Sequence, residues 1–128
     1  MEQKMDWDLQ DIGSKINAQV VAVTASLNDA WRNELITLNL PNGVLNKIWL
    51  ETAYFGVYLL QKRFSNPLSE EKRKVVNKNV RDGFLLIIPS VIFSADTDDE
   101  KNTLKEYIAS EYDRTLEMYE NYKGFGIQ

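Results

Sequence analysis

Apolar residues recur at steps of three and four along most of the chain. Near the start, this series consists of Leu9, Ile12, Ile16, Val20, Val23, Leu27, Trp31 and Leu38. Such spacing places the side chains on one face of an α-helix. Similar series begin at Leu45 and Leu104, and polar or proline-containing breaks lie at 40–43, 65–69 and 94–99. The pattern predicts four helices, over residues 7–39, 44–64, 69–95 and 98–123.

Two of the predicted helix starts have capping sequences. Thr97 precedes two aspartates and Glu100, an arrangement in which the threonine caps the first amides and the glutamate reaches back. Ser69 precedes Glu70 and Glu71 in a similar way. Because the loops between the helices are short, we expect neighbouring helices to run antiparallel. The predicted fold is all-α, an antiparallel up-down four-helix bundle in which residues 1–128 form a single domain.

One alternative concerns residues 36–49, with the sequence ITLNLPNGVLNKIW. Its first part alternates between apolar and polar residues and is followed by a turn triplet, which is typical of a β-hairpin. A hairpin there would make the fold α+β. The residues after Gly43 return to helical spacing, which favours a helix, a loop and a second helix.

Composition excludes several classes of chemistry. The chain has no cysteine and no histidine, so it lacks thiolate nucleophiles, the commonest general base and the usual zinc ligands. A net charge of −4 argues against binding to nucleic acid or anionic lipid. The run from Phe84 to Phe93 is too short to span a bilayer, and the acidic N-terminus does not resemble a signal peptide. We expect a cytoplasmic protein without a metal ion or cofactor.

Two of the predicted helices have more apolar surface than one core stripe requires. In residues 69–95, Leu86 and Phe93 lie almost opposite the predicted core stripe, with Pro89 between them. In residues 44–64, Tyr54 and Tyr58 lie away from the line of Leu45, Thr52 and Leu59. A protein partner, a second copy of the chain or a ligand cleft would account for such faces. The predicted interface residues are Glu51, Tyr54, Tyr58, Leu86, Pro89 and Phe93. Alternatively, the helix over residues 44–64 is more central than a regular bundle allows.

The leading hypothesis is a protein-interaction module, such as a regulator, inhibitor or adaptor, that forms a homodimer or binds another protein through the helices over residues 44–64 and 69–95. A second hypothesis is a small apolar ligand or lipid in a cavity lined by Trp31, Trp49 and Phe55. A carboxylate- or metal-dependent enzyme has the least support, and no catalytic residue is assigned. Glu111 falls on a predicted core face, and we expect a buried ion pair between it and Arg81.

Overall fold

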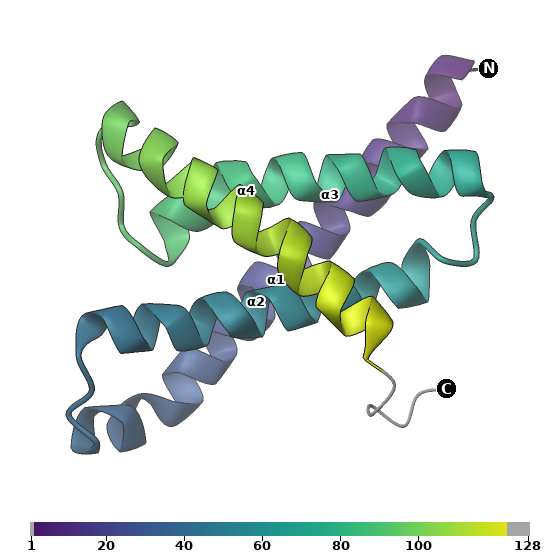
Figure 1. Ribbon diagram of the computed structural model, residues 1–128. Coiled ribbons are helices and arrows are strands. Elements are labelled where there is room, and N and C mark those ends of the chain that lie inside the picture. Colours follow the sequence, from purple (N-terminus) through teal and green to yellow (C-terminus); the bar gives the residue numbers. More distant parts are fainter. Residues whose placement is uncertain (1, 123–128) are drawn as a thin grey trace.

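The computed structural model consists of helices joined by short loops, and it describes residues 2–122, with side chains from Leu9 onward except Asn42 (Figure 1). The helices are α1 (Glu2–Thr37), α2 (Asn42–Phe64), α3 (Glu70–Val91) and α4 (Asp98–Asn121). The described residues contain no β-strand, which confirms the all-α fold with four helices. The alternative hairpin over residues 36–49 is not formed, since residues 42–49 lie in the first turns of α2.

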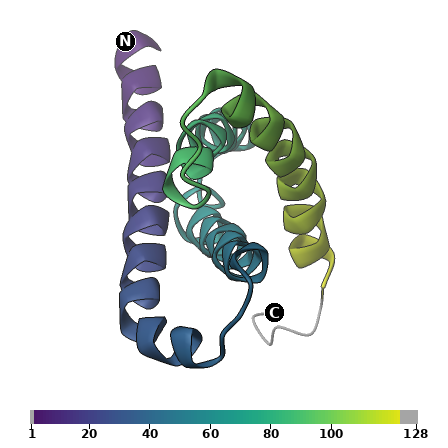
Figure 2. The same ribbon diagram turned by 90° about the vertical axis from the view of Figure 1, so that its left-hand side faces the viewer.

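The four helices are arranged in three layers (Figures 1 and 2). In the middle layer, α2 and α3 run antiparallel to each other. On one side α1 crosses this pair obliquely and on the other side α4 does so, and each outer helix contacts both middle helices. A helix in a middle layer has to bury two faces rather than one stripe. Much of the apolar surface that α2 and α3 have beyond one core stripe is therefore covered by α1 and α4 of the same chain.

Three aromatic rings meet where the middle layer faces α4. The ring of Tyr54 from α2 lies 5.6 Å from that of Phe84 from α3, and Tyr112 from α4 lies 6.1 Å from the first and 5.2 Å from the second. All three side chains are buried. Aromatic rings bury large apolar areas and add a favourable edge-to-face contact. This cluster is therefore a central element of the core.

On the other side of the middle layer, α1 approaches α3 closely at two glycines. A Cβ atom at Gly13 would lie 3.0 Å from Cβ of Asn79, and one at Gly83 would lie 2.5 Å from Nδ2 of Asn17. The same Nδ2 donates a hydrogen bond of 3.0 Å to the Val80 carbonyl in the core. A side chain at Gly13 would crowd the Asn79 Cβ, and one at Gly83 would displace the Asn17 amide from its hydrogen bond, so both glycines permit the close approach of α1 and α3.

The ends of the helices agree with the sequence signals in some places and differ from them in others. The predicted caps are present: Ser69 accepts a hydrogen bond from the Lys72 amide, and Thr97 accepts one from the Glu100 amide. At the other end, α3 stops at Val91 rather than at residue 95, because Ser94 turns the chain with φ of 54°. α3 continues through Pro89, and α1 begins at Glu2 rather than at residue 7.

Candidate functional site

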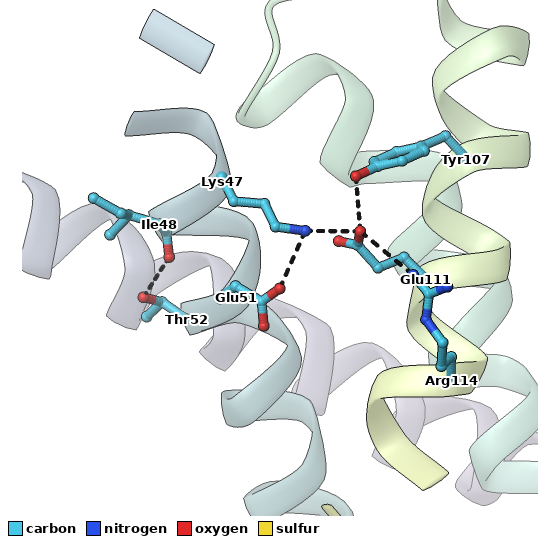
Figure 3. A network of polar contacts seen from close by, with 7 residues as sticks. All are labelled: Lys47, Ile48, Glu51, Thr52, Tyr107, Glu111 and Arg114. Atoms are coloured by element: carbon cyan, nitrogen blue, oxygen red, sulfur yellow. Dashed lines mark hydrogen bonds and ion pairs between the residues drawn. The ribbon is translucent and has the colours of Figure 1, made fainter. Parts of the chain in front are cut away.

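A network of charged and phenolic groups joins α2 to α4 (Figure 3). Lys47 and Glu51 are one turn apart on α2, as Tyr107 and Glu111 are on α4, so each pair shares one helix face. Nζ of Lys47 lies 2.8 Å from Oε2 of Glu111 and 3.3 Å from Oε1 of Glu51. The Tyr107 hydroxyl donates a hydrogen bond of 2.7 Å to the same Glu111 oxygen. Arg114 lies 4.0 Å from that oxygen.

Glu111 is the buried member of this network, with a side chain that is only 5% exposed, whereas Lys47 is 49% exposed. Burial by itself raises the pKa of Glu111, but the hydrogen bonds from Lys47 and Tyr107 and the charge of Lys47 outweigh it, so the pKa lies below 4.5. The hydrogen bond to Glu111 in turn raises the pKa of Lys47. Both groups are therefore charged at neutral pH, and they form an ion pair.

Tyr54 and the second oxygen of Glu111 lie at the inner end of the network. Both the Tyr54 hydroxyl and Oε1 of Glu111 are buried, and neither makes a hydrogen bond of good geometry to any of the described residues. Burial, followed by the charge of Glu111, raises the pKa of Tyr54, so this hydroxyl stays protonated. A protonated donor near a buried carboxylate favours the ionised form of Glu111.

The network is suited to holding two helices together rather than to chemistry. The ammonium group of Lys47 occupies the space between the Glu51 and Glu111 carboxylates, where a cation would otherwise bind. Within the described residues there is no group of three or more acidic, histidine or cysteine side chains that could hold a metal ion. The sequence predicts Glu51 as an interface anchor, and here it is partly buried and paired with Lys47.

The predicted ion pair between Arg81 and Glu111 is not formed. Arg81 instead donates two hydrogen bonds, of 2.8 and 2.9 Å, to the carboxylate of Asp113. Glu111 and Asp113 are two positions apart on α4, so they point to different neighbours. Asp113 contacts α3, whereas Glu111 contacts Lys47 on α2. The burial of Glu111 follows the prediction, but its partner comes from the other middle helix.

Half of the predicted interface residues lie inside the protein. Tyr54, Tyr58 and Pro89 are buried, because the outward faces assigned to their helices are covered by α1 or α4. Phe93 is partly buried and packs against the core. Of the six, only Leu86 is strongly exposed, at 72%. The structure therefore does not bring the six residues together on one surface, and Tyr54, Tyr58 and Pro89 have their partners within the chain.

The three predicted cavity residues do not meet either. Trp49 lines a groove of about 310 Å³ between the second half of α1, the start of α2 and the end of α3, with Leu45 and Val91 among its walls. Trp31 is exposed and lies outside this groove. Phe55 packs edge to face on the ring of Tyr119, 5.5 Å away. Of the three residues, Trp49 alone lines this groove.

Exposed apolar side chains occur instead in a row along α1. Val23, Leu27 and Trp31 follow one another at intervals of four residues, and they are 45%, 36% and 56% exposed. The row continues the face on which Ile16 and Val20 are buried. With 36 residues, α1 is much longer than α3 with 22, so its last turns extend beyond the helices that cover its first half. In the sequence, the greater length of the first predicted helix was the signal that its last turns would extend beyond the other helices.

None of the helices, over the part of the chain that is described, has both the length and the apolar character needed to cross a membrane.

Comparisons with known proteins add no identification. No protein-family model, curated protein or solved structure matches the chain.

Proposed function

We propose that this protein is an interaction module that self-associates through α1. The surface consists of Val23, Leu27 and Trp31, together with the small residues Ser26 and Ala30 beside them, and is called the α1 face below. The observation that carries the proposal is that a core-facing apolar row continues for two further turns in which its three large side chains are 36–56% exposed. A contiguous exposed apolar surface is typical of a binding site for a protein.

The order of large and small residues favours a second copy of the chain as the partner. Consider two α1 helices packed antiparallel about a point between Asn28 and Asp29. Trp31 of one copy then lies level with Ser26 of the partner subunit, and Leu27 lies level with Ala30 of the partner subunit. A two-fold axis repeats both contacts, as an isologous interface requires. Layers that combine one large and one small side chain allow the helices to pack closely.

Charge falls at the edge of the α1 face rather than at its centre. Ser26 adds a hydroxyl but no charge, and only Glu34, one turn beyond Ala30, brings a charge onto the face, where it is exposed. A polar rim around an apolar centre is the usual arrangement of an interface. A contact between single helices buries less than the roughly 800 Å² per partner of a standard interface. We therefore expect a dissociation constant in the micromolar range.

Sedimentation velocity tests the proposal. From about 1 to 500 µM, a range that spans a micromolar dissociation constant, we expect the sedimentation coefficient of the wild-type protein to rise. The double variant Leu27→Glu/Trp31→Glu should sediment as a monomer throughout. The matched control is Leu86→Glu, which puts the same charge on an exposed leucine of α3 and should behave as the wild type. A wild-type monomer at every concentration, or a double variant that still associates, would overturn the proposal.

We further propose a cytoplasmic location, which the cysteine-free composition supports because such a chain needs no oxidising compartment for disulfide formation.

A further inference from the structure

A second surface lies between the first half of α1 and the last turns of α2. It is a groove of about 440 Å³, lined by Ile12, Lys15, Ile16 and Gln19 from α1 and by Leu60, Arg63 and Phe64 from α2. This volume falls within the range of small-molecule sites in proteins, roughly 300–1,000 Å³. Four of its walls are large apolar side chains, so the groove is suited to an apolar chain rather than to a polar molecule.

Two cations stand beside these apolar walls. The guanidinium of Arg63 lies 5.5 Å from the centre of the Phe64 ring, so a cation–π contact holds it against one wall of the groove. Lys15 pairs with Asp11 at 3.0 Å, but both side chains are well exposed, so this pair is weak and can be exchanged. The chain has a net charge of −4, which makes a cationic apolar groove unusual on it.

Arg63 differs from its neighbour Lys62 in how its charge is balanced. Lys62 pairs with Glu120 at 3.5 Å. Among the side chains that the structure describes, Arg63 has no such carboxylate within ion-pair distance, and its guanidinium is free to bind an anion. Arginine is well suited to this, because its planar group can hold both oxygens of a carboxylate or phosphate at once.

We propose that this groove binds an amphipathic anion, a molecule with one apolar chain and one negatively charged head group. The chain lies along Ile12, Ile16, Leu60 and Phe64, and the head group contacts Arg63 and Lys15. Burial of the chain supplies the attraction, and the two cations select the charge of the head group. The site does not depend on self-association, since its lining residues lie outside the α1 face.

Isothermal titration calorimetry with three detergent-like probes tests the proposal. Dodecanoate, dodecyl maltoside and dodecyltrimethylammonium share one apolar chain but have anionic, neutral and cationic head groups, and each is used below its micelle concentration. We expect dodecanoate to bind saturably and about tenfold more tightly than the neutral probe, as one good charge interaction would produce. Binding of dodecyltrimethylammonium should be the weakest. Equal affinity for the three probes, or no saturable binding of dodecanoate, would overturn the proposal.

Variants separate the head-group contact from the apolar contact. Arg63→Gln should bring the affinity for dodecanoate close to that for dodecyl maltoside, while the affinity for the maltoside is unchanged. Phe64→Ala should weaken both. Arg32→Gln removes a cation from α1 outside the groove and should alter neither. If Arg63→Gln, shown by circular dichroism to be folded, binds dodecanoate as the wild type does, the assignment of the head group is wrong.

The titrations are repeated with the double variant Leu27→Glu/Trp31→Glu. Unchanged dodecanoate binding in this variant shows that the groove acts in the single chain, whatever the outcome of the self-association experiment. Loss of binding there would contradict the separation of the two surfaces.

Discussion

Replacing Lys47 with methionine removes a positive charge from the buried Glu111 and keeps most of the aliphatic side chain. Exposed ion pairs contribute about 0–1 kcal/mol, and breaking a buried pair costs about 3–5 kcal/mol. This pair lies between the two cases, because Glu111 is buried, Lys47 is half exposed and Tyr107 still donates its hydrogen bond. We therefore expect Lys47→Met to lower the free energy of unfolding at neutral pH by about 2 kcal/mol. In a chain of this size, that is a fall in Tm of roughly 5–10 °C.

The loss should depend on pH in a defined direction. In the wild type, the pKa of Glu111 is below 4.5, so its ionisation stabilises the fold above about pH 4.5, and this stabilisation is lost as the pH falls through the folded-state pKa. In Lys47→Met, burial continues to raise the pKa of Glu111 while its main opposing contact is gone. In the variant, Glu111 is therefore protonated at a higher pH, which removes the unpaired buried charge. The difference in the free energy of unfolding between the two proteins should then shrink as the pH falls.

Urea denaturation followed by circular dichroism, at intervals from neutral pH to about pH 3, measures both effects. The control is Lys74→Met, since Lys74 pairs with Glu70 at 3.7 Å and both side chains are well exposed. That change should cost less than about 0.5 kcal/mol. A loss in Lys47→Met that is no larger than in the control, or that is the same at every pH, would refute this account of the network.

Four further changes have defined outcomes in the same denaturation assay. Gly83→Ala should destabilise by about 1–2 kcal/mol, because overpacking against Asn17 exceeds the gain in helix propensity. Gly56→Ala should be neutral or stabilise by up to about 1 kcal/mol, since its Cβ would meet a valine methyl at an ordinary 3.6 Å. Arg81→Ala should cost less than about 1 kcal/mol, because its ion pair is exposed; a larger loss would mean that the pair is buried. Leu86→Asp should change stability by less than about 0.5 kcal/mol, and a greater effect would show that this leucine is covered.

Local patterns in the sequence were sufficient for the presence of the four helices and for the starts of α3 and α4, whereas α1 begins five residues earlier than predicted. The steps of three and four residues predicted the four helices, and the caps at Ser69 and Thr97 depend only on residues within one turn. The end of α3 was placed too late, because the positive φ of Ser94 is not a residue preference that a sequence pattern reveals.

The arrangement of the helices in space was beyond such patterns. The angle at which two helices cross depends on which rows of side chains interlock, and these rows involve residues far apart in the sequence. Tyr54 shows the consequence: it lies off the expected core line of its helix, yet it is buried because α2 is covered on two sides. Trp31 shows the converse, since it lies on the core line of α1 but beyond the reach of the other helices.

The site residues were affected in the same way. Periodicity places Glu111 on the buried face of α4, but it does not tell which of α2 and α3 lies against each side of that face, and this decides whether Arg81 meets Glu111 or Asp113. The burial of Glu111 could be predicted from its place in the apolar stripe, whereas the identity of Lys47 as its partner required the layered arrangement of α2 and α4.

Disulfide trapping tests self-association through the α1 face most directly, because the chain has no cysteine of its own. In the proposed antiparallel pair, the two copies of residue 30 are separated along the helix axis by about 5 Å, and the two copies of residue 22 by about 20 Å. Under mild oxidation, Ala30→Cys should therefore form a covalent dimer rapidly, whereas Ala22→Cys, at a position that is also exposed, should remain monomeric. Equal rates of cross-linking for the two variants, or none for Ala30→Cys, would contradict the proposed pairing.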